Sequence, residues 1–271
     1  MNTSGGQPSA SSQTKTTTRH SVTELTSAER WASKQYAKIL DERATRLGMF
    51  RGLYQGRRIF CLGSGPSLLS QDPKLLARQV VISTNAAHRW LRTAGLLPTV
   101  NVCSDRLRLV ELQDELPDPL FIFPTGIKHK SGARDWIAAV KRHPSWIPLR
   151  GEGPRGWRTQ GPPTFDPSVA VQHCGRSVIF MAVQLAVFMG AASVALVGVD
   201  MDYLGPETHF TPGLEPRNTA TIYDSCRPAF VTFREELERR GIEFLNATAG
   251  GRVDVLPRAD FATLCRQQGD Q

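Results

Sequence analysis

The sequence lacks paired cysteines, and this absence excludes two classes of site. Its 271 residues include five cysteines, an odd number, and no two of them form a C-x-x-C pair. A zinc site and a disulfide framework both need cysteines at short or regular spacings, so neither is indicated. We therefore expect a reducing compartment, the cytoplasm, with the inner face of the membrane as a more specific location.

Signatures of several enzyme and binding classes are also absent. No Gly-Lys-Ser/Thr follows a glycine-rich loop, so there is no P-loop, and no G-x-S-x-G elbow indicates a hydrolase. The N-terminus lacks the apolar stretch of a secretory signal. Basic residues are spread along the chain without an arginine-rich arm, so nucleic acid is not an expected partner.

Composition and charge are those of a globular protein that meets anions. The chain is 40% hydrophobic and 21% charged, with a net charge of +8. This balance favours anionic partners such as nucleotides, phosphorylated sugars or anionic lipid surfaces. Residues 1–24 are rich in Ser and Thr and have few large apolar side chains, so we expect a disordered tail there. An N-terminal helical segment, 25–54, and a nucleotide-binding domain, 55–271, are expected to follow.

The longest uncharged stretch has two interpretations. Residues 177–199 carry no charge and are numerous enough to span a bilayer. A break at residues 190–193 and a β-branched second half instead favour a buried helix, 177–189, and a buried strand, 194–199. We predict helix and strand, and no transmembrane span.

Short apolar runs alternate with helical segments over most of the chain. Strands are expected over residues 58–62, 80–83, 99–103, 120–123, 194–199 and 242–245. Further helices are expected over residues 27–47, 73–78, 86–93, 106–115, 132–142, 229–240 and 259–266, with long loops over 143–167 and 200–220. Nearly all strand residues are apolar, which is typical of a parallel sheet covered on both faces. The sequence predicts an α/β, Rossmann-like fold whose ligands bind at the carboxyl ends of the strands.

The most informative segment is the turn after the first expected strand, Gly63-Ser64-Gly65-Pro66-Ser67-Leu68. Its glycines would let the backbone approach closely and take positive φ, and proline suits the first position of a helix. The N–H groups of Gly65, Ser67 and Leu68 would then favour an anion such as phosphate. The alternative is a tight turn that needs glycine for its geometry alone.

Polar residues follow the other strands. Asn85 and Asp105 would each hydrogen-bond a base or ribose, or else cap the next helix. Asp200 and Asp202 would hold Mg²⁺ or Mn²⁺ against a diphosphate, or else cap a turn and face solvent. His209, in a loop near the same strand end, would act as a general base, or else be an ordinary exposed loop histidine.

In their order along the chain, these motifs resemble a bacterial domain family related to archaeal 6-hydroxymethylpterin diphosphokinase and to one class of bacterial sialyltransferases. The resemblance covers about residues 55–210. It rests on the glycine-rich turn, Ser83-Thr84-Asn85, Asp105, the apolar stretch 177–190, Val197-Gly198-Val199-Asp200, Tyr203 and His209-Phe210. It implies a Rossmann-like, GT-A-like sheet with a nucleotide site.

The resemblance also implies roles for single residues. In the sialyltransferase relatives the turn and an Asn hold CMP, a Ser or Thr contacts the nucleotide sugar, and a Tyr stabilises the leaving phosphate. These roles carry over to Gly63, Gly65, Pro66, Ser67, Asn85, Ser177 and Tyr203, and we group Ser64, Asp105, Gly198 and Asp200 with the nucleotide-binding residues. Asn is usual at the position of Ser64. The relatives' catalytic histidine lies much further beyond the Tyr than His209 does.

Three functions are compatible with these patterns. One is a glycosyltransferase that uses a nucleotide sugar, with a CMP-linked donor favoured, and a cell-surface glycan or lipid-linked acceptor; His209 would be its base. Another is a diphosphokinase that uses ATP and a pterin-like alcohol, with Mg²⁺ at Asp200 and Asp202. The last is a non-catalytic nucleotide-binding protein. The sialyltransferase relatives work without a metal and the diphosphokinases use Mg²⁺, so both alternatives remain for the two aspartates.

Overall fold

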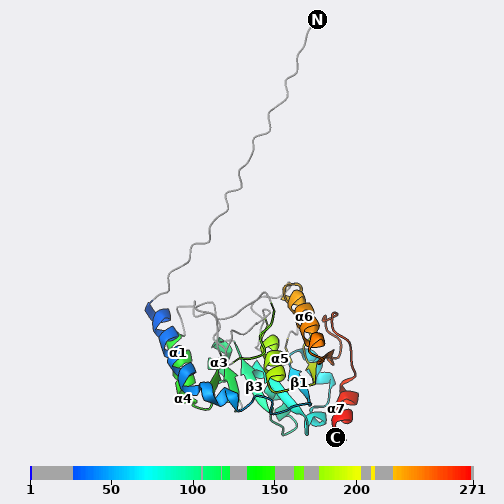
Figure 1. Cartoon of the computed structure of the whole chain (residues 1–271), viewed down its shortest axis with the longest axis horizontal. Coiled ribbons are helices and arrows are strands. Elements are labelled where there is room, and N and C mark those ends of the chain that lie inside the picture. Colours follow the sequence, from blue (N-terminus) through cyan, green and yellow to red (C-terminus); the bar gives the residue numbers. More distant parts are fainter. Residues whose placement is uncertain are drawn as a thin grey trace.

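The computed structural model describes residues 1, 27–104, 106–116, 118–122, 133–149, 162–167, 177–202, 209–210 and 222–269. Figure 1 shows these residues as a central sheet with helices packed around it. The tail predicted over residues 1–24 lies outside the described residues apart from Met1.

Seven strands form the sheet, in the order β5-β4-β3-β2-β1-β6-β7. They are β1 (Arg58–Leu62), β2 (Val80–Thr84), β3 (Val100–Cys103), β4 (Leu120–Ile122), β5 (Ile147–Pro148), β6 (Ser193–Val197) and β7 (Glu243–Asn246). Every neighbouring pair is parallel. The chain moves outward from β1 to β5 and then crosses back, so that β6 pairs with the other side of β1. This is a doubly wound order, and it confirms the predicted α/β fold.

The strands are apolar because both faces of the sheet are covered. Side chains of β1 alternate between two core clusters: Ile59 and Cys61 enter one, and Phe60 and Leu62 enter the other. Strand β6 alternates in the same way, and all five of its residues are buried. A strand buried on both faces shows a continuous apolar run in place of polar alternation.

Seven α-helices and three short 3₁₀ helices are found among the described residues. The α-helices are α1 (Ser27–Gly48), α2 (His88–Arg92), α3 (Arg106–Leu112), α4 (Ala133–Arg142), α5 (Ile179–Phe188), α6 (Ile222–Arg239) and α7 (Phe261–Gly269). The 3₁₀ helices are η1 (Pro66–Ser70), η2 (Pro73–Leu76) and η3 (Asn85–Ala87). Helices α5 and α6 cover one face of the sheet, where the ring of Phe180 packs at a tilt against those of Phe230 and Phe233. Helices α2 and α7 cover the other face, where Trp90 lies against Phe261.

The uncharged stretch of residues 177–199 is a helix and a strand, as predicted. Helix α5 ends at Phe188, Gly190 takes a φ of +93°, and β6 begins at Ser193. None of the helices in the described part of the chain is both long and apolar enough to cross a membrane.

Two element predictions are wrong in an instructive way. Strand β5 lies inside the predicted loop 143–167; it has two residues and ends in Pro148, which an edge strand tolerates. Helix α6 begins at Ile222 rather than residue 229 and contains Pro228. The buried side chains of Tyr223 and Cys226 anchor the first turns of α6 in the core, which offsets the hydrogen bond that Pro228 cannot donate.

Helix α1 covers the β5 edge of the sheet and lies beside α4 (Figure 1). The Tyr36 hydroxyl donates to the carbonyl of Leu149 at 2.8 Å. The guanidinium of Arg43 donates to the carbonyls of Val140, His143 and Trp146 at 3.1, 3.0 and 2.9 Å. These contacts bind α1 to the end of α4 and protect an edge strand from pairing with other chains.

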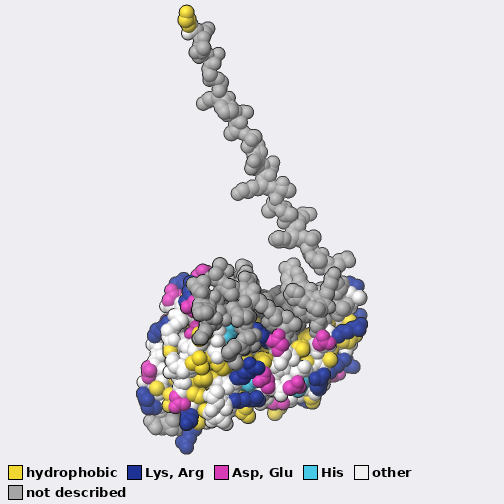
Figure 2. Space-filling view, turned by 180° about the vertical axis from the view of Figure 1, so that it is seen from behind, with side chains coloured by type: hydrophobic (Ala, Val, Ile, Leu, Met, Phe, Trp, Pro, Cys, Tyr) yellow, Lys and Arg dark blue, Asp and Glu magenta, His cyan; other side chains and the backbone are white. Residues whose placement is uncertain are grey.

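Charged side chains of both signs are mixed on the face shown in Figure 2. Lys and Arg side chains alternate there with Asp and Glu over the described surface. A nucleic-acid site needs basic residues gathered on one face or along one helix. This face therefore lacks, among its described residues, the continuous basic stripe of a nucleic-acid groove.

Candidate ligand site at the carboxyl edge of the sheet

The loops that follow β1 and β6 lie against each other. The direction of the strand order reverses between these two strands, and open α/β sheets bind ligands at such a point. The Gly63 N–H donates to the carbonyl of Val197, and the Gly65 N–H donates to that of Gly198, both at 2.8 Å. The glycine-rich turn therefore begins as an extension of the sheet.

The glycines of the turn are required by close packing rather than by positive φ. Gly65 has a φ of −69° and a ψ of 155°, which any residue can adopt, so the expectation of positive φ is wrong here. A Cβ on Gly63 would overlap the carbonyl of Gly198, and one on Gly65 would overlap the carboxylate of Asp200. Positive φ occurs instead at Gly198, where φ is +66° and a Cβ would lie 2.6 Å from the side chain of Leu68.

The anion at the start of η1 is the carboxylate of Asp200. The Ser67 N–H donates to Oδ1 at 3.3 Å, and the Ser67 hydroxyl donates to Oδ2 at 2.7 Å. The Leu68 N–H donates to the carbonyl of Gly65 at 3.3 Å. The prediction that the N–H groups of Gly65, Ser67 and Leu68 are free for a phosphate is therefore wrong in this arrangement. A phosphate at this position must displace Asp200.

Burial raises the pKa of Asp200, although the hydrogen bonds from Ser67 lower it. The carbonyl of Asp200 accepts the Arg252 N–H at 2.7 Å, and Gly251 packs against the same peptide. The side chain of Asp202 is exposed. Among the described residues, no three His, Cys, Asp or Glu side chains are grouped to hold a metal ion. Since Asp200 is engaged by Ser67, the described carboxylates do not form a ready metal centre.

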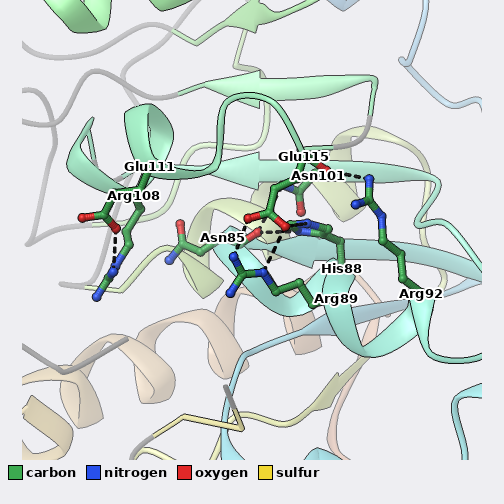
Figure 3. A network of polar contacts seen from close by, with 8 residues as sticks. All are labelled: Asn85, His88, Arg89, Arg92, Asn101, Arg108, Glu111 and Glu115. Atoms are coloured by element: carbon green, nitrogen blue, oxygen red, sulfur yellow. Dashed lines mark hydrogen bonds and ion pairs between the residues drawn. The ribbon is translucent and has the colours of Figure 1, made fainter. Parts of the chain in front are cut away.

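Asn85 follows β2 and adopts a left-handed backbone with a φ of +48°. Its carbonyl lies 3.0 Å from Nδ1 of His88 and 3.4 Å from Nδ2 of Asn101 (Figure 3). Its side-chain Oδ1 is buried and has no hydrogen-bond partner among the described residues. The interpretation of this side chain as a helix cap is therefore wrong. An unpaired buried acceptor costs about 1–3 kcal/mol, which a donor on a ligand would offset.

His209 and Phe210 lie next to the glycine-rich turn. The Phe210 N–H donates to the carbonyl of Ser64 at 3.0 Å, and its ring packs on the cluster that contains Leu68. This contact brings the half-buried His209 to the side of the turn. Two residues expected at the site, Tyr203 and Asp105, lie outside the described residues.

Ser177 occupies the start of α5. Its hydroxyl accepts the Ile179 N–H at 3.4 Å, and its carbonyl accepts the Phe180 N–H at 3.3 Å. Ser177 is half-buried at the first turn of a helix that is buried almost throughout. Pro66 begins η1, where a missing N–H has no cost.

The loop after β7 completes this edge of the sheet, and sequence reasoning gave it no role. The Thr248 hydroxyl accepts the Val199 N–H at 3.1 Å. The guanidinium of Arg258 donates to the carbonyls of Thr248 and Gly251 at 3.0 and 3.1 Å. The signal that would have found the loop is its position: Gly250, Gly251 and Arg252 follow a predicted strand, as the other site residues do.

Comparisons with known proteins give similarity by structure and none by sequence. No protein-family model and no curated protein matches the sequence. Among solved structures, the chain is similar to the MAf glycosyltransferase from Magnetospirillum magneticum AMB-1, at 15% sequence identity and a TM-score of 0.47. The similarity covers 86% of this chain and 41% of that protein, so the chain spans less than half of its length.

Proposed function

We propose that the protein is a glycosyltransferase that binds a nucleotide sugar at the carboxyl edge of β1, β2 and β6. The observation that carries the proposal is the buried Oδ1 of Asn85, which has no partner in the described part of the chain and lies at a strand end beside the reversal point of the sheet. A nucleoside offers suitable donors in its ribose hydroxyls and its base N–H groups. The family resemblance favours a CMP-linked donor and a glycan or lipid-linked acceptor.

The Asp200–Ser67 contact gives this proposal a specific first step. When the donor phosphate reaches the turn, the N–H and hydroxyl of Ser67 change partner from the carboxylate to the phosphate. Because burial already raises the pKa of Asp200, its charged form is less favoured than that of an exposed carboxylate. Binding of the donor thus exchanges one anion for another at the start of η1.

His209 is the proposed general base. Its neutral imidazole takes the proton of an acceptor hydroxyl, and the oxygen of that hydroxyl attacks the anomeric carbon of the sugar. The bond from the anomeric carbon to the phosphate oxygen breaks, and the nucleotide leaves with the electron pair. Tyr203 is proposed to hold the departing phosphate. The contact between Phe210 and Ser64 supports the placement of the base beside the turn.

A ligand screen by thermal unfolding tests the proposal. CMP, UDP, GDP and ATP are each added with and without Mg²⁺, and a ligand at about 100 times its Kd should stabilise the fold by about 2.7 kcal/mol. We expect CMP to stabilise the protein with or without Mg²⁺. Stabilisation by ATP alone, and only with Mg²⁺, would support the diphosphokinase instead.

Two variants test whether the nucleotide binds at Asn85. Asn85→Ala should weaken CMP binding by about 1 kcal/mol, roughly a fivefold rise in Kd, because one hydrogen bond is lost. Gln267→Ala removes an exposed amide from α7. Gln267 contacts Arg58 at the start of β1, the opposite end of the strand from the candidate site, so the Kd should stay unchanged. The proposal fails if no nucleotide binds, or if both variants bind CMP as the natural protein does.

A further inference from the structure

A buried histidine, His88, contacts the backbone carbonyl of Asn85. His88 begins α2, and its side chain is fully buried. Its Nδ1 is 3.0 Å from the carbonyl oxygen of Asn85. A carbonyl can only accept a hydrogen bond, so Nδ1 must carry the proton. Burial lowers the pKa of His88, which favours the neutral ring, and in a neutral ring Nε2 is then unprotonated.

The surroundings of Nε2 offer it no hydrogen bond among the described residues. Nε2 is buried, has no hydrogen-bond partner among the described residues, and lies 3.9 Å from the carboxylate of Glu115. That carboxylate is already paired with the guanidinium of Arg89, whose Nε donates to it at 3.1 Å. Arg92 donates to the carbonyl of Glu115 at 2.7 Å (Figure 3). Burial and the charges of Arg92 and Arg89 lower the pKa of His88 and outweigh the Glu115 carboxylate, which raises it, so the neutral ring is favoured.

Asn101 supplies a second donor to the same carbonyl. It lies on β3, is fully buried, and its Nδ2 is 3.4 Å from the carbonyl oxygen of Asn85. Its Oδ1 accepts the hydroxyl of Ser83 from the neighbouring strand. Because the carbonyl of Asn85 can only accept, the Nδ2 end of the Asn101 amide faces it. The peptide after Asn85 is therefore held from two elements, α2 and β3.

The backbone of Asn85 needs such support. A φ of +48° is uncommon for a residue with a Cβ, although asparagine tolerates it better than most. The value of φ also sets the direction of the Cα–Cβ bond and hence of the side-chain amide. If the left-handed conformation relaxed, Oδ1 would no longer lie in its buried position at the strand end.

We infer that His88, protonated on Nδ1, and Asn101 are positioning residues that hold Asn85 in its left-handed conformation and so direct its amide at the nucleoside. The inference rests on the proposed function, because that proposal makes Asn85 the nucleoside contact. Neither His88 nor Asn101 touches the ligand. Both act through the carbonyl of Asn85.

NMR of the ligand-free protein tests the positioning directly. The ¹⁵N shifts of His88 report which ring nitrogen is protonated, and the one-bond Cα–Hα coupling of Asn85 distinguishes positive from negative φ. We expect Nδ1–H on His88 and positive φ at Asn85 in the natural protein. A proton on Nε2 in the neutral ring would overturn the inference without the need for any variant.

Two substitutions of His88 separate the hydrogen bond from the space that the ring fills. His88→Leu removes the donor and keeps an apolar group of similar bulk, whereas His88→Asn returns an N–H near the position of Nδ1. Positive φ at Asn85 should be lost in the first and kept in the second. If His88→Leu keeps the positive φ, the inference is wrong. Leu91→Val, a change at another buried residue of the same helix, controls for general loss of stability.

Calorimetric titration with CMP then tests whether the conformation of Asn85 affects the Kd for CMP. His88→Leu should raise the Kd for CMP by up to about fivefold, the change expected for Asn85→Ala, because His88 acts only through Asn85. His88→Asn and Leu91→Val should stay close to the natural protein. Equal binding by the natural protein and His88→Leu would overturn the inference. If the natural protein shows the expected NMR results but does not bind CMP, the positioning stands and the proposed function fails.

Discussion

At Gly65 a single methyl group decides whether the loops after β1 and β6 fit together. A Cβ there would overlap the Asp200 carboxylate and lie 2.8 Å from the carbonyl of Gly198. Gly65→Ala should lower the free energy of unfolding by about 1–3 kcal/mol, measured by urea denaturation, because the packed loops must move apart. Gly48→Ala is the matched control, since no atom lies within 4 Å of its Cβ. A similar loss of stability in both variants would contradict this account.

Asp200 should make stability depend on pH. Burial raises its pKa in the folded state above the unfolded value of about 3.9. Its contribution to stability is therefore fully present below that pH and is lost as pH rises through the raised pKa. The free energy of unfolding of the natural protein minus that of Asp200→Asn should fall over this range and then level off, in a urea series from about pH 4 to pH 8.

Ser67→Ala provides the comparison for the same group. It removes the hydroxyl that donates to Asp200, and this hydrogen bond lowers the pKa of the carboxyl. The fall in stability should therefore shift to higher pH in Ser67→Ala. If the free energy of unfolding of the natural protein minus that of Asp200→Asn instead grows with pH or stays constant, the carboxyl of Asp200 is not stabilised in its neutral form.

The sequence predicts where the candidate site residues lie in the fold more reliably than it predicts their contacts. It placed Gly63–Ser67, Asn85 and Asp200 at strand ends, because polar residues that follow buried strands gather at one edge of a parallel sheet. It did not identify Asp200 as the partner of Ser67, since 133 residues separate them and the pairing depends on the strand order. The unpaired Oδ1 of Asn85 depends on three-dimensional packing and leaves no pattern in the sequence.

At the scale of elements, α1 and α4 are joined by Arg43. Arg43→Met keeps the apolar stem of the side chain but leaves the carbonyls of Val140, His143 and Trp146 without these donors. Its free energy of unfolding should fall by about 2–4 kcal/mol, because hydrogen bonds from a charged group are lost and polar atoms stay buried. Chemical denaturation followed by circular dichroism measures the change.

Arg46→Met is the control, since Arg46 is exposed and contacts the carbonyl of Pro144 from the next turn of α1. Its effect should stay within about 0.5 kcal/mol, as for most surface substitutions. Equal effects of Arg43→Met and Arg46→Met would mean that Arg43 does not join the two helices.

The elements found from sequence are those with long, unambiguous patterns. Four consecutive apolar residues were enough for β1 and for β6, and a break at Gly190 separated α5 from the following strand. Strand β5 has two residues and no periodicity, so pairing with β4 is its only signature. The early start of α6 was hidden by Pro228, because local chemistry argues against a helix there and tertiary packing outweighs it.

At the scale of the whole molecule, stability should be highest in the middle of the sheet. Strands β1, β2 and β6 are buried between two core clusters, whereas β5 is at the edge and has two residues. Native-state hydrogen exchange should therefore be slowest at the amides of Phe60, Ile82 and Leu196, and faster at Ile147. Equal protection of Ile147 and Phe60 would mean that the sheet opens only as a unit.

The strand order could not be derived from the elements alone. A parallel sheet with helices on both faces is consistent with several orders of seven strands. Strand β6 lies beside β1, and α5 and α6 pack together on one face; neither arrangement can be read from the pattern of apolar residues. That placement creates the reversal point and brings Gly198 and Asp200 onto the turn.

The carboxylate of Asp200 occupies the start of η1, so it would compete with any anionic ligand for the N–H and hydroxyl of Ser67. A group tethered to the protein has an effective concentration of about millimolar or higher. A free phosphate ion must therefore compete with a carboxylate that is always present at the turn. We therefore expect inorganic phosphate and other small anions to bind weakly at this turn. A ligand that also binds at Asn85, as proposed, would gain free energy that helps it to displace the carboxylate. This edge of the sheet would thus select ligands that contact the protein at more than one place.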